Sequence, residues 1–105
     1  MYKLLIVDDN EPDRRGIMRH VNWEELGVVT ADAANGQLGL EKALAEKPDI
    51  VLTDISMPYM NGIEMTKQII EQNDKTQVIF MSCFDDFDFA LSGIKMGVAD
   101  YILKP

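Results

Sequence analysis

Short apolar runs alternate along this chain with longer segments in which apolar residues recur every three or four positions. Runs of four or five apolar residues bounded by polar ones are typical of strands buried on both faces of a sheet. The expected strands are 3–7, 28–32, 49–53, 77–81 and 99–103. The expected helices are 12–22, 36–46, 62–72 and 86–96. Strands that alternate with helices predict an α/β fold, with a parallel sheet covered by helices on both faces.

The second expected helix, 36–46, has an apolar stripe and an internal glycine. Leu40, Ala43 and Leu44 share one stripe and are expected to face the sheet, whereas Leu38 falls off it and is expected to be exposed. Gly39 lies inside the helix, where it costs about 0.5–1 kcal/mol relative to alanine. Either a neighbour packs closely against it or the fold tolerates the loss.

Polar residues follow the apolar runs at the points where the strands end. Asp8 and Asp9 follow the first, Asp54 the third, Ser82 the fourth and Lys104 the fifth. The strands of a parallel sheet end at the same edge, and ligands of open α/β sheets bind there. Three carboxylates in one cleft favour a hard divalent cation such as Mg²⁺.

Composition narrows the function classes. The chain has 105 residues, enough for one domain, and a net charge of −8, which argues against nucleic-acid binding by this segment. Cys83 is the one cysteine, so no internal disulfide forms, and the single histidine is too distant in sequence to suggest a catalytic thiol. No apolar run approaches the roughly 20 residues that span a bilayer. We therefore expect no membrane segment and a cytoplasmic location.

Taken together, the strand-end motifs resemble the receiver domain of two-component response regulators. The matching segments, in order, are Val7-Asp8-Asp9, Asp54-Ile55-Ser56-Met57-Pro58, Asn61-Gly62, Ser82 and Tyr101-Ile102-Leu103-Lys104-Pro105. The resemblance implies a flavodoxin-like, doubly wound sheet of five parallel strands in the order 2-1-3-4-5. Two further segments, 22–27 and 84–87, resemble receivers that are joined to AraC-type DNA-binding domains.

The resemblance also implies a phosphoacceptor and a metal site. Asp54 would take a phosphoryl group from a sensor histidine kinase and signal to an output domain that binds DNA. Asp9, Asp54 and the backbone carbonyl of Ser56 would bind Mg²⁺ directly, and Asp8 would bind it through water. Such a domain catalyses its own phosphorylation and dephosphorylation and is not otherwise an enzyme.

The remaining implied roles concern the response to phosphorylation. Lys104 would pair with the phosphoryl oxygens, Ser82 would move toward them and form a hydrogen bond, and Tyr101 would swing inward with Ser82. The Lys104–Pro105 peptide bond would be cis.

Three positions depart from the family's usual pattern. Asp13 lies where an apolar residue is expected in the first helix, and Asn10 replaces a frequent glutamate. Phe84 lies two residues past Ser82, at a position that in this family tunes the access of water to the acyl phosphate. A phenylalanine there would shield it, so that Phe84→Ala would speed autodephosphorylation.

Two other functions compete with this interpretation. A haloacid-dehalogenase-like phosphohydrolase also uses a strand-end aspartate with Mg²⁺, but it needs a second aspartate where this chain has Ser56. A pseudo-receiver that acts only as an interaction module would lack one of the acids or Lys104. A nucleotide-binding domain is disfavoured because no glycine-rich loop follows Val7.

Residues 1–105 are expected to form one receiver domain that stops before a fifth helix. Without that helix, apolar surface beside the last strand would stay exposed or be covered by a partner. A homodimer and concentration-dependent association are the corresponding expectations.

Overall fold

The computed structural model describes residues 1–82, 91 and 95–104. Its strands are β1 (Tyr2–Val7), β2 (Val28–Ala33), β3 (Ile50–Asp54), β4 (Gln77–Ser82) and β5 (Asp100–Leu103). Its helices within these residues are α1 (Glu11–His20), α2 (Gly36–Glu46) and α3 (Gly62–Gln72). All five predicted strands and the first three predicted helices are confirmed, and no strand end is shifted by more than one residue. Most of the fourth predicted helix, 86–96, lies outside the described residues, although 91, 95 and 96 have helical backbone.

The predicted bounds of the first helix, 12–22, were wrong at both ends. The Asn10 side chain accepts a hydrogen bond from the backbone N–H of Asp13, so the helix begins at Glu11 and Pro12 lies inside its first turn. At the other end the backbone of Val21 is extended, and the helix stops at His20. Side-chain capping, rather than the apolar stripe, sets this helix start.

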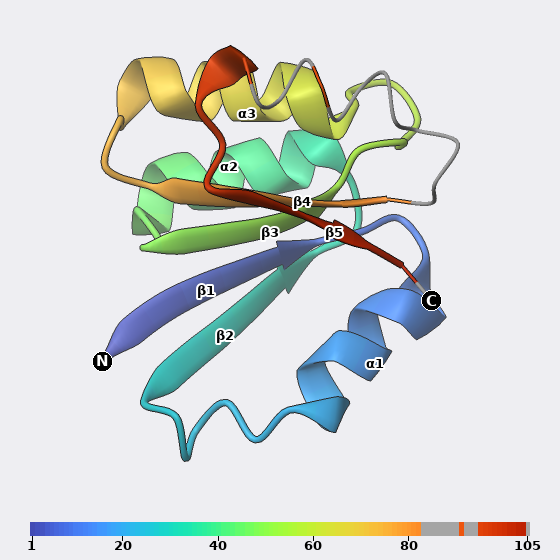
Figure 1. The fold of residues 1–105 in the computed structure, drawn as a ribbon, viewed down its shortest axis with the longest axis vertical. Helices are drawn as coiled ribbons and strands as arrows, with labels where there is room; N and C mark the ends of the chain where they lie inside the picture. Colours follow the sequence, from blue (N-terminus) through green and yellow to red (C-terminus); the bar gives the residue numbers. More distant parts are fainter. Residues whose placement is uncertain (83–90, 92–94, 105) are drawn as a thin grey trace.

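The five strands form one parallel sheet in the order β2-β1-β3-β4-β5, as predicted. Helix α1 covers one face, and α2 and α3 lie side by side over the other (Figure 1). The chain therefore crosses from one face to the other after β2, and β1 and β3 lie next to each other at the centre of the sheet. The carboxyl ends of β1 and β3 are thereby brought together.

Each face of the sheet has its own hydrophobic core. Under α2 and α3 the buried side chains come from alternate strand positions and from both helices, among them Val7, Val51, Phe80, Leu40 and Met65. Under α1 the core is smaller and contains Leu4, Ile6, Leu52 and Met81. The alternation of side chains along each strand explains why the apolar runs are continuous, since both faces are covered.

Helix α2 confirms one expectation about its leucines and contradicts another. Leu40 and Ala43 are buried and Leu38 is 42% exposed, as predicted, but Leu44 is 41% exposed instead of facing the sheet. At 3.6 residues per turn, Leu44 lies about a quarter turn from the centre of the stripe that the buried residues define. A spacing of four from Leu40 is therefore insufficient to bury it.

Gly39 is explained by close packing. A Cβ atom at this position would lie 2.8 Å from Sδ of Met65 and 2.9 Å from Cγ2 of Val7. We expect Gly39→Ala to destabilise the domain by about 1–3 kcal/mol in urea unfolding, because overpacking outweighs the gain in helix propensity. Gly16→Ala is the matched control: its Cβ would meet only Nδ1 of His20, at 4.0 Å.

The control should stabilise the domain by up to about 1 kcal/mol, since Gly16 lies inside α1. If both substitutions were to stabilise the domain equally, the close approach of α2 to Val7 and Met65 would be disproved.

The sheet face beside α1 is open next to β5. A groove of about 500 Å³ is lined by Ile17, Trp23, Leu52, Met81 and Ile102, among others. Ile102 and Leu103 are about half exposed. The expectation of exposed apolar surface beside the last strand is thus confirmed, while association between copies of the chain stays a prediction.

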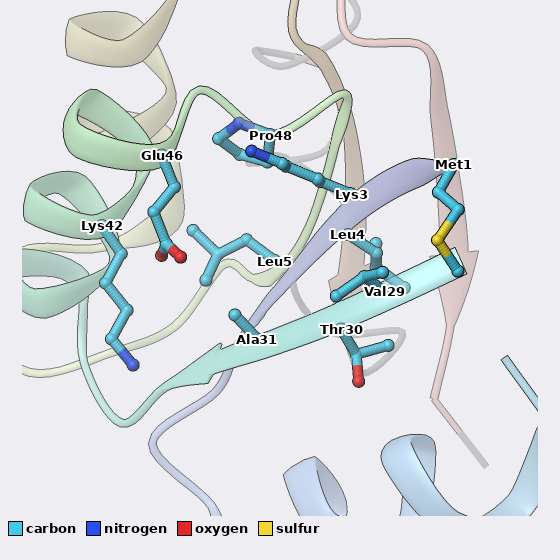
Figure 2. A pocket seen from close by; sticks show the side chains of 10 residues that line it. All are labelled: Met1, Lys3, Leu4, Leu5, Val29, Thr30, Ala31, Lys42, Glu46 and Pro48. Carbon is cyan, nitrogen blue, oxygen red and sulfur yellow. The ribbon is translucent and has the colours of Figure 1, made fainter. Parts of the chain in front are cut away.

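A second hollow, of about 300 Å³, lies toward the amino-terminal ends of β1 and β2. Figure 2 shows Lys42 and Glu46 reaching from α2 toward the strand residues Leu5 and Ala31. The Lys42 ammonium donates to the backbone carbonyl of Asp32. This pocket shares no residue with the strand-end polar groups.

Among residues 1–82, 91 and 95–104, none of the helices combines the length and the hydrophobicity that a membrane span requires.

Candidate functional site

Three carboxylates meet where β1 and β3 end. Asp8 and Asp9 follow β1, and Asp54 is the last residue of β3. One carboxylate oxygen from each of the three lies within 4.8 Å of the others. Asp8 and Asp54 are buried and Asp9 is exposed, so the cluster opens to solvent on the Asp9 side. The convergence predicted from the ends of the apolar runs is confirmed.

Lys104, which follows β5, reaches into the same cluster. Its Nζ atom lies 2.8 Å from Oδ2 of Asp8 and 3.2 Å from Oδ2 of Asp54. A third contact, of 3.2 Å, joins it to Oδ2 of Asp13 in the first turn of α1. One ammonium therefore contacts three carboxylates, which leaves the cluster with excess negative charge among the described residues.

Both the side chain and the backbone carbonyl of Asp8 accept hydrogen bonds from residues that follow it in the chain. Its Oδ1 atom accepts a hydrogen bond from the backbone N–H of Asn10, at 2.9 Å. Its backbone carbonyl accepts one from the Arg14 guanidinium, at 2.8 Å, and Arg14 also forms an ion pair with Asp32. The turn after β1 is thus fastened to α1 and to β2, which fixes the direction of the Asp8 side chain.

The loop after β3 places Asp54 through close backbone contacts. The N–H of Gly62 donates to the carbonyl of Ile55 at 2.8 Å, and a Cβ atom on Gly62 would lie 2.2 Å from the carbonyl oxygen of Asp54. Asn61 caps α3 and forms a capping box with Glu64. Glycine is required at position 62 because the helix starts against the backbone of the aspartate itself.

Ser82 and Tyr101 lie on the neighbouring strands. Their hydroxyl groups share a hydrogen bond of 2.9 Å, and Ser82 is fully buried. Tyr101 is half-buried and packs against the larger core. The backbone N–H of Lys104 donates to the carbonyl of Ser82 at 2.8 Å, so the ends of β4 and β5 are joined beside the acids.

The charge state of Asp54 reflects its surroundings. Burial raises the pKa of its carboxyl group above the ordinary value; Lys104 opposes this rise, and the Asp8 charge adds to it. For Lys104, burial alone would lower the pKa, but the contacts with Asp8, Asp54 and Asp13 raise it. Lys104 is therefore charged at neutral pH, and the ionised form of Asp54 is less favoured in the folded state than in the unfolded state.

This difference predicts a pH dependence of stability. Because the folded state binds the Asp54 proton more tightly, the stabilisation from this group is complete below the unfolded pKa of about 3.9 and is lost as the pH rises through the folded pKa. We therefore expect Asp54→Asn to be more stable than the parent domain at neutral pH without divalent cations, as measured by urea unfolding.

The advantage of Asp54→Asn should disappear toward acidic pH. Asp74→Asn, an exposed position in the turn after α3, serves as the control and should leave stability unchanged. Equal stabilities of Asp54→Asn and the parent domain at every pH would contradict the account of Asp54.

The donor set fits a hard divalent cation. Three carboxylates, of which Asp9 is exposed, supply the oxygen ligands that Mg²⁺ prefers, and the open side leaves room for water ligands. Burial is the main reason that the pKa of Asp54 is raised, and the neighbouring Asp8 charge adds to the rise; a cation beside both carboxylates would oppose both effects. The backbone carbonyl of Ser56 as a metal ligand stays a prediction.

Sequence reasoning missed two residues of this neighbourhood. Arg14 reaches the turn after β1, and Asp13, noted only as an unusual residue for its helix, contacts Lys104. The single histidine, His20, is exposed at the end of α1. The predictions about Cys83, Phe84 and the Lys104–Pro105 peptide bond concern positions outside the described residues.

Comparison with known proteins gives one consistent family. The family model of the response regulator receiver domain matches residues 4–105. The uncharacterized transcriptional regulatory protein YesN of Bacillus subtilis is 38% identical over 106 aligned residues, which cover 100% of this chain and 29% of YesN. LnrK, a transcriptional regulatory protein of the same organism, is 38% identical over 104 residues, covering 99% of this chain and 47% of LnrK.

Solved structures agree with these sequence relatives. The REC domain of AraT, a response regulator from Geobacillus stearothermophilus, superposes with a TM-score of 0.91 at 36% identity, covering 99% of this chain and 81% of that one. A two-component transcriptional regulator AraC from Clostridium phytofermentans gives a TM-score of 0.86 at 32% identity, with coverage of 100% and 81%. This chain spans less than half the length of YesN and LnrK.

Proposed function

This chain belongs to the response regulator receiver domain family, and on that premise we propose that Asp54 accepts a phosphoryl group in a Mg²⁺-dependent reaction. The observation that carries the proposal is the position of the Asp54 carboxylate. One of its oxygens lies within 4.8 Å of carboxylate oxygens of Asp8 and Asp9, and its Oδ2 atom is 3.2 Å from Nζ of Lys104.

Phosphoryl transfer asks the protein for positioning and charge compensation more than for covalent help. A carboxylate oxygen of Asp54 forms a bond to phosphorus while the P–N bond of a phosphohistidine breaks. The bonding electrons leave with the imidazole ring, which takes up a proton from solvent. Lys104 offsets the negative charge of the phosphoryl oxygens from one side.

We assign the metal to Asp9, Asp54 and the backbone carbonyl of Ser56, with Asp8 holding it through water. When bound, Mg²⁺ supplies the positive charge that lets one anion approach another. The geometry of the cluster supports this assignment, because three carboxylates lie within 4.8 Å of one another and Lys104 is the one ammonium that contacts Asp8 and Asp54 among the described residues.

The response to phosphorylation would start at Ser82. Its hydroxyl group shares a hydrogen bond of 2.9 Å with the hydroxyl group of Tyr101, and we expect it to donate to a phosphoryl oxygen once Asp54 is phosphorylated. Because the backbone N–H of Lys104 donates to the carbonyl of Ser82, a movement of Ser82 would be transmitted to β5. The charge added at Asp54 would in this way shift the conformational equilibrium of the surface that contains β5.

The proposed partners are a sensor histidine kinase, which donates the phosphoryl group, and a DNA-binding output domain in the full protein. YesN and LnrK are transcriptional regulators, and this chain spans less than half of either. The acidic receiver itself, with a net charge of −8, would not contact nucleic acid. The cytoplasm is the location that such partners imply.

Incubation with acetyl phosphate and Mg²⁺ tests the proposal. We expect one phosphoryl group per chain, labile to base, and almost none when Mg²⁺ is chelated. Steady multiple-turnover release of phosphate, without a trapped phosphoprotein, would favour a phosphohydrolase. Absence of labelling with donor and metal in excess would favour a pseudo-receiver and overturn the proposal.

A further inference from the structure

Asp13 is a fourth carboxylate at the edge of the acidic cluster. It lies in the first turn of α1, where an apolar residue was expected, and its Oδ2 atom is 3.2 Å from Nζ of Lys104. Its position is well defined, because its backbone N–H donates to the capping side chain of Asn10 and Pro12 precedes it. Asp13 and Lys104 also both line the groove beside α1.

The Lys104 ammonium has as many carboxylate partners as it has hydrogens to donate. An ammonium carries three N–H donors, and the structure gives Lys104 contacts with Asp8, Asp54 and Asp13. A phosphoryl oxygen that arrives on Asp54 therefore needs a donor that is already in use. One of the three contacts must be released before Lys104 can bind the new group.

While Asp54 has not yet reacted, Asp13 is the partner of Lys104 whose contact is released at the lowest cost. Its side chain is 46% exposed, whereas the side chains of Asp8 and Asp54 are 0% and 10% exposed. A released Asp13 is solvated by water, while a released Asp8 would be a buried carboxylate without its cation.

We propose that Asp13 is a positioning residue that holds one donor of Lys104 and so slows capture of the phosphoryl group by the site. The proposal rests on the function proposed for Asp54. The Asp13 charge acts in the same direction, since it opposes the approach of an anionic donor. Asp13 thereby lowers the rate of phosphorylation, and an apolar residue at this position would remove this effect.

The test compares the second-order rate constants for phosphorylation by acetyl phosphate at saturating Mg²⁺. Asp13→Asn and Asp13→Ala should each raise it about two- to fivefold, the size that one partly exposed ion pair can contribute. Glu11→Gln is the matched control: it removes the same charge from the same turn of α1, but Glu11 pairs with Arg15 instead of Lys104. It should leave the rate constant within about 1.5-fold of the parent value, since this charge has no contact with Lys104.

Nuclear magnetic resonance of the Lys104 side chain provides a second measurement. The ¹⁵N resonance of its ammonium should move in Asp13→Asn and stay in place in Glu11→Gln, a pattern that a merely structural role would not give. Unchanged or slower labelling of Asp13→Asn, or an equal gain in Glu11→Gln, would overturn the inference. If the parent domain is labelled on Asp54 while Asp13→Asn matches it, the inference alone fails; if the parent domain takes no label, the proposed function fails with it.

Discussion

Replacing Asp54 with asparagine is expected to reduce phosphoryl incorporation from acetyl phosphate to background, with the fold intact. The carboxamide has nearly the shape of the carboxylate but is a poor nucleophile, so no acyl phosphate forms. Asp8 and Asp13 also contact Lys104, but the acceptor role is proposed for Asp54 alone, so neither of them should take the label.

Intact-protein mass spectrometry after incubation with donor and Mg²⁺ measures this loss. Asp74→Asn, which removes the same charge from an exposed turn, should incorporate as much phosphoryl as the parent domain. The far-ultraviolet circular dichroism spectra of all three proteins should coincide. Full labelling of Asp54→Asn would show that the phosphoacceptor is a different residue.

Lys104→Met is expected to lower the free energy of unfolding by about 1–3 kcal/mol at neutral pH without divalent cations. The substitution leaves Asp8, whose side chain is 0% exposed, without its cation. The loss of one partner of a fully buried pair costs about 3–5 kcal/mol. The cost is smaller here because Lys104 is 13% exposed and the cluster opens to water on the Asp9 side.

Urea unfolding measures this effect, and Mg²⁺ should recover part of the lost stability by supplying positive charge to the same carboxylates. The difference should also shrink in acid, where the aspartates are protonated. Lys67→Met, on the exposed side of α3, is the control and should change stability by less than about 0.5 kcal/mol. A Lys104→Met domain as stable as the parent, with or without Mg²⁺, would contradict the electrostatic account of the cluster.

The sequence predicted the site well because parallel strands end at a common edge. The apolar runs before Asp8, Asp54 and Lys104 identified three strands, and their shared direction brings those polar groups together although 96 positions separate the first from the last. The order of the strands could not come from periodicity; it came from the family resemblance, and the structure confirms it.

The missed features share a physical cause. The contact of Asp13 with Lys104 depends on how α1 is placed against β5, and the Arg14 contact depends on a long side chain that reaches back to the preceding turn. The exposure of Leu44 depends on the rotation of α2 about its own axis relative to the sheet. Spacing along the chain locates the apolar stripe of a helix but does not fix the contacts at its edges.

The most direct test of the central claim is to map the phosphorylated residue in the parent domain. After incubation with acetyl phosphate, the acyl phosphate is reduced with borohydride to the stable alcohol, and the modified peptide is sequenced by mass spectrometry. The account predicts a single modified residue, Asp54, and modification only when Mg²⁺ is present. Modification at any other residue, or modification of Asp54 that is independent of the metal, would contradict it.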